Sequence, residues 1–464
     1  MVFSSITFLY YFLPVVILCY FAFHKKCTNA VLFIFSLLFY AWGEPVYVLL
    51  MLFSTVFNFI FGLKIEGSEN PRRKRLLIFS VAVNFLILFY FKYSGFLLSI
   101  LNSVFGCEIR INEISLPVGI SFYTFQTVSY IADVYMKRAK AQRNFVNFGC
   151  YIALFPQLIA GPIVRYNTIE EQLSCRRETV SKFGNGISRF IAGLAKKVLI
   201  ANNIGSLWGY VSSLPADEVS TFTSWLGIFA FTLQIYFDFS GYSDMAIGLG
   251  KMFGFDFDEN FNYPYISKSV SEFWRRWHIS LGTWFKEYVY IPMGGSRVKK
   301  GRLFLNIFAV WMLTGLWHGA SFNFILWGIY YGALLMLEKT FLLKQLKKCS
   351  SFVQHIYTML SVVLGWVLFA SENLSYAFDY LKIMFGFGAQ AIADSTALYL
   401  LCSYFVVFAF GILGCMPYPK KLFKRAMKNK GFKKMSPFIG AAVFLLCTAY
   451  LVDSTFNPFL YFRF

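Results

Sequence analysis

The chain has 464 residues, of which 58% are hydrophobic and 14% are charged, and its mean hydropathy is +0.57. Soluble domains have an apolar share of roughly 45–50%, so this composition excludes a water-soluble fold. The formal net charge of +20 comes from basic residues in short loops between apolar runs. This placement indicates anchoring to anionic lipid headgroups and not nucleic-acid binding.

Apolar runs long enough to cross a bilayer recur along the chain. A transmembrane helix needs roughly 20 apolar residues, and such runs cover 3–23, 46–63 and 437–452. The first run lacks a basic start and a small-residue cleavage site, so we expect a mature helix and not a signal peptide. No Gly/Ser/Pro-rich linker separates a soluble part, and a single membrane-embedded domain over residues 1–464 is predicted.

Basic clusters alternate with pairs of apolar spans, as the positive-inside rule predicts if every cluster is cytoplasmic. The turns at 107–116, 214–221 and 372–394 are poorer in Lys and Arg and are expected outside. This pattern predicts an all-α polytopic membrane protein with about eleven to twelve transmembrane helices and both termini outside. The basic clusters lie at 24–26, 64 with 72–75, 137–143, 297–302, 339–348 and 420–434.

Two segments depart from the simple helical pattern. Residues 146–165 contain breaks at Phe155-Pro156-Gln157 and Gly161-Pro162, and we expect a re-entrant or bent segment buried in protein. Lys196 and Lys197 interrupt an otherwise apolar stretch. An intramembrane charge is costly and indicates function, but a lysine can also snorkel to the interface, and both interpretations stay open.

His318 is a candidate general base. The chain has only four histidines, and this one lies in the apolar segment 313–321 between Gly315 and Gly319, which admit close approach of backbone or substrate. Burial disfavours imidazolium, so the ring could accept a proton from a hydroxyl at neutral pH. The alternative is a hydrogen-bonded structural histidine between helices.

His278 lies in an aromatic and basic segment, 272–288. At helical spacing, Trp277, Leu281, Trp284 and Tyr288 would share one face, which predicts an interfacial amphipathic helix. This helix would be either an aromatic belt with snorkelling arginines or a cytoplasmic mouth that receives a phosphate-bearing acyl donor. The candidate substrate-binding residues are Trp274, Arg275, Arg276, Trp277 and Lys286 in this segment, with Trp317 and Asp238 outside it.

The basic cluster at 297–302 suggests different depths for the two histidines. If this cluster is cytoplasmic, residues 303–317 form a helix of about 22 Å at 1.5 Å per residue, and His318 lies towards the outer leaflet. His278 precedes the cluster and stays near the inner side. A donor could then enter from the cytoplasm and an acceptor from outside.

Acidic residues are rare inside the apolar sequence, and Asp238 and Asp244 stand out. The expected role is a structural ion pair with Arg275 or Arg276, and the alternative is that Asp238 orients a histidine through its second ring nitrogen. The nine cysteines are scattered singly, so neither a disulfide framework nor a metal site is predicted. No G-x-S-x-G elbow or phosphate-binding glycine loop supports a self-contained hydrolase or nucleotidase.

Several motifs resemble those of a known family. The segments Trp-Arg-Arg-Trp-His-Ile-Ser-Leu at 274–281, Tyr-Ile-Pro-Met-Gly-Gly-Ser-Arg at 290–297 and Leu-Trp-His-Gly-Ala at 316–320 are similar to signatures of the membrane-bound O-acyltransferase (MBOAT) family. Segments 155–162, 236–244 and 457–464 resemble those of its bacterial alginate O-acetyltransferase membrane subunit branch.

The resemblance implies a fold, a reaction and partners. Helices would ring a thin central core with inner and outer funnels in the bacterial cytoplasmic membrane, with His318 as the catalytic histidine and His278 as the second motif histidine. An acyl group, foremost acetyl, would pass from a cytoplasmic thioester, acetyl-CoA, towards an extracytoplasmic polysaccharide acceptor. An outer partner of hydrolase-like fold would complete the esterification, and no bound cofactor is implied.

Two other functions remain open from the sequence. A related branch moves D-alanine from a carrier protein's thioester to teichoic acid, and would need a cytoplasmic acyl-donor protein. The motif starting at Ile291 and the C-terminal Tyr-Phe-Arg-Phe favour the acetyl branch. A transporter or flippase would predict internal repeats, and the chain contains no second copy of its Trp-His motifs. A structural scaffold would leave these motifs unexplained.

Overall fold

The computed structural model describes residues 1–24, 27–109, 114–159, 161–453 and 460. These residues are mostly helical, and no β-strand occurs among them. The predicted all-α fold is therefore confirmed. Some sequence features lie outside the described residues, namely Lys25, Lys26, residues 110–113, Ala160 and the C-terminal motif 457–464 apart from Leu460.

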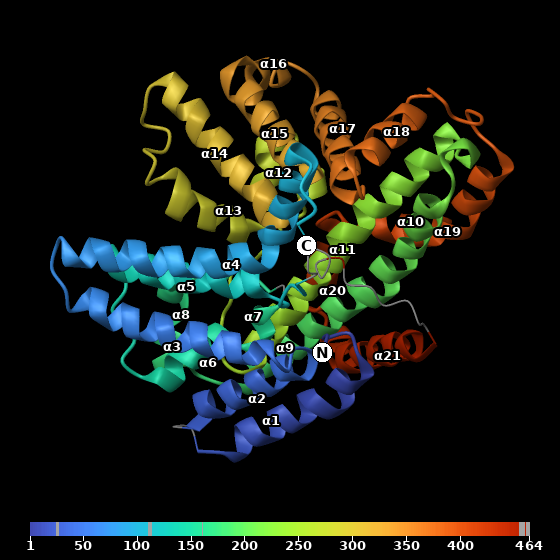
Figure 1. The fold of residues 1–464 in the computed structure, drawn as a ribbon. Coiled ribbons are helices and arrows are strands. Elements are labelled where there is room, and N and C mark those ends of the chain that lie inside the picture. The colour runs from blue at the N-terminus through green and yellow to red at the C-terminus, as the bar shows by residue number, and fades with distance from the viewer. Residues whose placement is uncertain (25–26, 110–113, 160, 454–459, 461–464) are drawn as a thin grey trace. The chain divides into compact units, whose positions relative to one another are not determined.

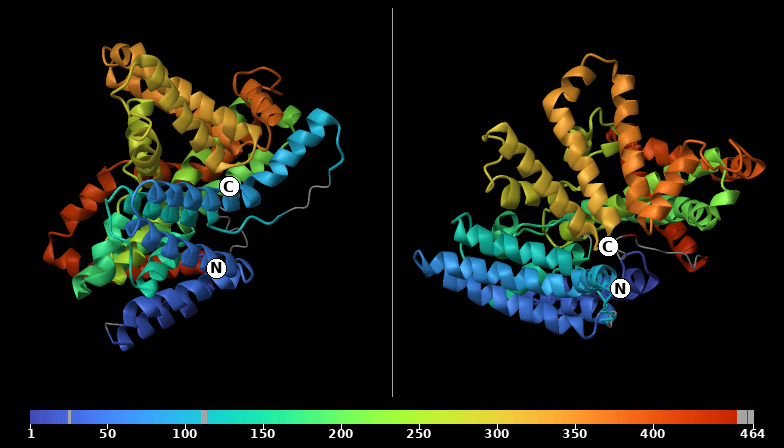
Figure 2. Two further views of the ribbon diagram at one scale, coloured as in Figure 1. Left: turned by 60° about the vertical axis from the view of Figure 1, so that its left-hand side comes forward. Right: turned by 45° about the horizontal axis from the view of Figure 1, so that its top comes forward.

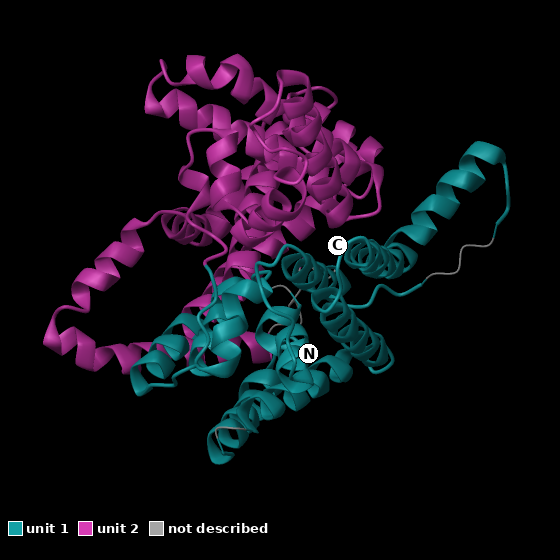
Figure 3. Cartoon of the chain, turned by 90° about the vertical axis from the view of Figure 1, so that its left-hand side faces the viewer, with its two compact units in different colours: residues 1–190, 243–258 teal, residues 191–242, 259–464 magenta. Residues whose placement is uncertain are grey.

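The backbone packing divides the chain into two compact units, which Figure 3 distinguishes by colour. Unit 1 comprises residues 1–190 and 243–258, and unit 2 comprises residues 191–242 and 259–464. The boundary passes through α9 (Val180–Ala195) and α11 (Thr221–Met252), which each contribute to both units. The prediction of one membrane-embedded domain is not tested by this division and stays a prediction.

Unit 1 contains helices of very different lengths. Within it, α3, α4 and α5 run side by side (Figures 1 and 2). Besides its part of α9 and α11, its helices are α1 (Leu13–Ala22), α2 (Thr28–Gly43), α3 (Tyr47–Glu66), α4 (Arg72–Phe105), α5 (Ile120–Tyr135), α6 (Phe145–Ala153), α7 (Phe155–Leu158) and α8 (Tyr166–Ser174).

Polar side chains join the three long helices of unit 1. Asn58 of α3 and Asn84 of α4 exchange two amide hydrogen bonds of 3.0 and 2.8 Å, and the Thr127 hydroxyl of α5 donates to Asn84 Oδ1 at 3.2 Å. Buried polar groups need such partners, and interhelical hydrogen bonds stabilise helix packing in a membrane.

The predicted break within residues 146–165 is confirmed. α6 ends at Ala153, α7 has only four residues, and residues 148–158 are all buried. The Gln157 amide donates to the Tyr151 carbonyl oxygen, and the Tyr151 hydroxyl donates to the Val164 carbonyl oxygen at 3.1 Å. Irregular backbone in a membrane protein is tolerated where protein surrounds it. That this segment re-enters the membrane stays a prediction.

Unit 2 holds both candidate histidines. Within it, α14 packs on α15 and α15 packs on α17 (Figures 1 and 2). A π-helical stretch, Lys196–Asn202, precedes its first complete helix. The remaining helices are α10 (Asn203–Ser213), α12 (Val270–Arg276), α13 (Ile279–Phe285), α14 (Lys300–His318), α15 (Phe322–Leu337), α16 (Leu343–Leu346), α17 (Ser351–Ala370), α18 (Leu374–Met384), α19 (Ser395–Gly414), α20 (Tyr418–Ala426) and α21 (Lys430–Asp453).

Glycines let α14 and α15 approach closely. A Cβ added to Gly328 would lie 2.5 Å from the Trp311 carbonyl oxygen, and one added to Gly315 would overlap the Phe324 carbonyl oxygen. Small residues at such crossings allow direct contact between helix backbones. This contact places the end of α14, where His318 lies, against α15.

Among the described residues, six helices are long and apolar enough to span a membrane. The polytopic membrane architecture is confirmed, but six is fewer than the predicted eleven to twelve. α11 has 32 residues, but polar side chains such as Gln234 and Asp238 lower its hydropathy. The six candidate spans are Tyr47–Glu66, Arg72–Phe105, Phe322–Leu346, Ser351–Ala370, Ser395–Gly414 and Lys430–Asp453, and shorter apolar helices cover Phe8–Ala22 and Thr28–Gly43.

Candidate active site

His318 is the last residue of α14 and lies in an aromatic enclosure. Its side chain is buried, and Gly319 continues with an extended backbone. The ring meets Trp327 of α15 edge to face at a centroid distance of 5.1 Å, and Phe369 of α17 at 5.2 Å. Phe324 lies parallel at 6.4 Å. Three helices, α14, α15 and α17, therefore surround the imidazole with aromatic rings.

His278 lies between α12 and α13 in a left-handed backbone conformation, with φ 44°. This conformation is uncommon for a residue other than glycine, and such strain is often kept at functional sites. The side chain is buried, and the Phe239 ring packs at right angles to it at 4.7 Å. Burial lowers the pKa of His278 to about 3, so the imidazole is neutral at physiological pH.

Asn260 orients the His278 ring. Its Oδ1 lies 3.1 Å from His278 Nδ1, and it also accepts hydrogen bonds from the backbone N–H of Ser280 at 3.2 Å and the Ser280 hydroxyl at 2.9 Å. Because a backbone N–H only donates, the Asn260 atom that faces these groups is the carbonyl oxygen. His278 therefore carries its proton on Nδ1, which leaves Nε2 unprotonated.

Changing the Asn260 acceptor should alter activity through His278. Asn260→Leu removes the acceptor and is expected to lower the transfer rate by roughly 10–100-fold, the size of effect seen when a metal-binding histidine loses the hydrogen-bond partner of its second ring nitrogen. Asn260→Asp keeps the acceptor but adds a negative charge that raises the pKa of His278. In Asn260→Asp, the raised pKa means that His278 becomes protonated as the pH falls. This variant should therefore lose activity at the acidic end of the pH range, where the parent protein stays active.

The measurement is the pH profile of acyl transfer from pH 5 to 8. Asn262→Leu is the matched control, because Asn262 is an exposed residue of the same loop. An Asn260→Asp variant with the parent pH profile would exclude the proposed control of His278.

Trp317 brings the two histidines into one cluster. Its ring centroid lies 5.0 Å from that of His318 and 5.9 Å from that of His278. The sequence-based prediction placed the two histidines at different membrane depths. Those depths stay a prediction, but both rings contact the same tryptophan in unit 2.

The prediction of a single amphipathic helix over 272–288 is wrong, because two short helices cover much of this segment. α12 ends at Arg276, and α13 begins at Ile279 after the left-handed residue His278. This break disrupts the helical spacing, and the side chains of Trp277 and Trp284 are buried instead of forming an exposed belt. The segment therefore positions His278.

The candidate substrate-binding residues differ in their environment. Trp274 packs against Trp311 at 4.9 Å and Tyr331 at 4.8 Å, and Trp277 packs against Trp366 at 5.0 Å. These contacts make both tryptophans part of the aromatic packing of unit 2.

The basic candidates lie nearer the surface. The Arg276 guanidinium pairs with Glu272 at 2.8 Å, and both side chains are partly exposed. Arg275 and Lys286 are exposed. The structure does not bring these cations to the histidine cluster, and their donor-binding role stays a prediction.

The predicted ion pair between Asp238 or Asp244 and Arg275 or Arg276 is wrong. Asp238 Oδ1 lies 2.6 Å from Lys197 Nζ, and both side chains are almost fully buried. Asp238 Oδ2 also accepts from the backbone N–H of Leu460 at 2.9 Å. In unit 1, Asp244 pairs with Arg189 at 2.7 Å.

The Lys197–Asp238 pair excludes one of the two interpretations of Lys197. This lysine lies in the π-helical stretch and is paired inside the protein instead of snorkelling to an interface. A functional role for this buried pair stays a prediction.

The sequence-based search missed Asn260, Phe239 and Phe369. Asn260 lies in a polar loop without helical periodicity, and phenylalanine is common throughout the chain, which contains 57 of them. The left-handed backbone of His278, which brings its ring to Asn260, was not predicted from the local sequence. Within the described part of the chain, no group of three His, Cys, Asp or Glu side chains could hold a metal ion.

The fold and the site define a class of protein, a polytopic helical membrane protein with a buried pair of histidines. Residues 136–378, which include both histidines, match the membrane-bound O-acyltransferase family. The chain belongs to this family, and it is a multi-pass membrane O-acyltransferase.

Bacterial relatives show the similarity in more detail. The probable alginate O-acetylase AlgI of Pseudomonas aeruginosa is 43% identical over 426 residues, covering 89% of this chain and 82% of the relative. The peptidoglycan O-acetyltransferase of Helicobacter pylori is 33% identical over 428 residues, covering 84% and 81%. The teichoic acid D-alanyltransferase of Bacillus subtilis is 31% identical over 229 residues, covering 47% of this chain and 58% of the relative.

Proposed function

We propose that this enzyme passes an acetyl group from a cytoplasmic thioester, acetyl-CoA, through the membrane towards O-acetylation of an extracytoplasmic polysaccharide. The observation that carries the proposal is the contact of His318 and His278 with one tryptophan, Trp317. The two relatives above whose names specify acetyl transfer match more than four fifths of both chains, which favours acetyl as the acyl group.

In the proposed reaction, His318 is the general base. The acceptor hydroxyl gives its proton to the imidazole while its oxygen attacks the thioester carbonyl carbon. The C–S bond then breaks, and the leaving thiolate takes the proton from the imidazolium as free CoA thiol. Proton transfer of this kind contributes roughly 10²–10⁴-fold to the rate, and holding donor and acceptor in line contributes further.

The proposed role of His278 is to position the donor. Asn260 fixes the orientation of its neutral ring, and Trp317 contacts both this ring and that of His318. This arrangement keeps the thioester beside the base without introducing a second charge into an apolar site.

We further propose that esterification of the polymer requires a second protein outside the membrane, of hydrolase-like fold. The chain carries no G-x-S-x-G nucleophile motif. The competing possibility is direct esterification, with His318 activating a sugar hydroxyl that enters from outside.

Reconstitution in lipid vesicles tests the donor and the partner together. We expect the purified enzyme with radiolabelled acetyl-CoA to move label to a small hydroxyl surrogate, and to label polysaccharide only when the outer partner is added. His318→Ala is the negative control. Efficient polymer labelling by the enzyme alone would refute the need for a partner and leave the histidine chemistry intact.

The same vesicle assay also tests a second candidate function. This second function is D-alanyl transfer, and the match to a teichoic acid D-alanyltransferase, which covers about half of this chain, supports it. If the enzyme turned over a D-alanyl carrier-protein thioester but did not turn over acetyl-CoA, D-alanyl transfer would replace the acetyl proposal. Movement of intact substrate without loss of label from CoA would identify a transporter instead.

A further inference from the structure

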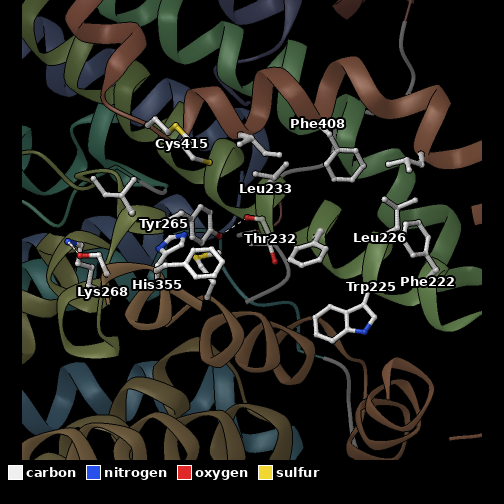
Figure 4. A pocket seen from close by; sticks show the side chains of 18 residues that line it. Phe222, Trp225, Leu226, Thr232, Leu233, Tyr265, Lys268, His355, Phe408 and Cys415 are labelled. Carbon is white, nitrogen blue, oxygen red and sulfur yellow. Dashed lines mark hydrogen bonds between the residues drawn. The ribbon is translucent and has the colours of Figure 1, made fainter. Parts of the chain in front are cut away.

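Unit 2 contains an elongated apolar cavity that the proposed reaction does not use. Its volume is about 720 Å³, within the roughly 300–1,000 Å³ range of sites that bind small molecules. Its wall comes mainly from α11, α17 and α19, and His278, His318 and Trp317 are not among its lining residues (Figure 4). We name this cavity the α11–α17–α19 groove. Apolar side chains that line it include Leu226, Phe229, Leu233, Met359, Phe408 and Ile412.

Basic and polar groups lie together at one end of the groove. Figure 4 shows Lys268 and His355 at this end, and Phe222 and Trp225 at the opposite end. The Lys268 ammonium donates to the Ser351 hydroxyl at 2.8 Å. The groove is therefore amphipathic along its length, with a cation at one end and an aromatic lining at the other.

The dimensions of the groove suit one leaflet of a bilayer. From Leu401 to the end of α19 at Gly414, its wall is about 20 Å long at 1.5 Å per residue. The hydrocarbon core of a bilayer is about 30 Å thick, so one leaflet supplies about half of that length. A lipid chain could follow the apolar wall while its headgroup stays at the polar end.

The flanking sequence puts further positive charge at this polar end. α17 begins there at Ser351, directly after the basic cluster 339–348. α19 ends there beside Cys415, and α20, which carries three lysines and one arginine, follows. Such clusters indicate the cytoplasmic leaflet, whose surface is rich in anionic lipid headgroups.

We propose that the α11–α17–α19 groove is a binding site for an anionic bilayer phospholipid. Its acyl chain lies along the apolar wall towards Trp225, and its phosphate accepts a hydrogen bond from the Lys268 ammonium at the polar end, beside His355. A transmembrane helix of another protein is the competing occupant, but it would not require the cation beside Ser351. This site is independent of the proposed acetyl transfer, because it uses none of the residues of the histidine cluster.

Quenching of Trp225 by brominated lipid measures occupancy directly. The full-length protein is placed in phosphatidylcholine nanodiscs, and phosphatidylglycerol with brominated acyl chains is added in increasing proportion. The Trp225 signal is obtained by subtracting the emission of Trp225→Phe. We expect half-maximal quenching at a proportion about fivefold lower than for brominated phosphatidylcholine, the effect of one favourable cation–headgroup interaction.

Two pairs of variants assign this preference to the groove. Lys268→Gln should abolish the fivefold preference, whereas Lys348→Gln should keep it, because Lys348 is an exposed lysine that does not line the groove. Ile412→Phe should fill the groove and remove the selective quenching. Leu413→Phe, at the next residue of α19 and outside the lining, should not. The second pair tests the site even if Lys268→Gln fails to fold.

Several results would overturn the proposal. Equal quenching by the two brominated lipids would exclude an anionic-lipid site, and equal losses in Lys268→Gln and Lys348→Gln would indicate general surface charge. Competition by soluble glycerophosphoglycerol as strong as that by the intact lipid would indicate a phosphate site without an acyl chain. A co-purified protein helix that crosslinks to the groove, and that phosphatidylglycerol does not displace, would identify the competing occupant.

Discussion

Replacing His318 with alanine is expected to lower acyl transfer by roughly 10²–10⁴-fold, the contribution of a general base. The imidazole is the group at the end of α14 that would accept the proton, and the surrounding Trp327 and Phe369 rings cannot replace it. The measurement is release of CoA thiol by the purified enzyme, together with polymer acetylation in cells that carry the variant as their sole copy. Expression and membrane insertion should remain normal.

Two controls separate lost chemistry from lost structure. Added imidazole should restore part of the activity of His318→Ala, because the vacated space retains its aromatic walls. His24→Ala removes an exposed histidine of unit 1 and should have no effect. His278→Ala should also impair transfer, by weakening donor placement. Near-normal polymer acetylation by His318→Ala would exclude His318 as the base.

Removing one partner of the Lys197–Asp238 pair is expected to destabilise the protein by about 3–5 kcal/mol, because the remaining charge would be buried without compensation. The two side chains are 3% and 2% exposed, and their N–O distance is 2.6 Å. Lys197→Met and Asp238→Leu should each lower the melting temperature in detergent strongly. The double variant should recover much of this loss, since no isolated charge remains.

A matched control is present in the same unit. Lys382 and Asp379 form an ion pair of the same residue types at 2.8 Å, but their side chains are 64% and 51% exposed. Lys382→Met should therefore cost at most about 1 kcal/mol. If Asp238→Asn kept its melting temperature and lost only turnover, Asp238 would be a functional residue, as the alternative sequence interpretation held.

The class of this protein can be read from its amino-acid sequence alone. Hydropathy depends only on composition and order, so the long apolar runs identified a polytopic helical membrane protein. The prolines within 146–165 correctly predicted the broken helix, because proline removes a backbone donor wherever it occurs. The scarcity of histidine, together with the Trp-His motifs, selected His278 and His318.

The contacts between distant residues could not be predicted from the sequence and became clear from the folded chain. Asp238 had two plausible arginine partners, but a π-helical turn brings Lys197 to it, and local patterns do not determine such long-range contacts. Helical spacing predicted one amphipathic helix around His278, whereas packing produced a left-handed residue held by Asn260. Trp317 links the two histidines because close packing of α14 on α15 fixes where α14 ends. Contacts between distant segments depend on how the whole core packs. Hydrophobic periodicity predicts only which face of a single helix or strand is buried.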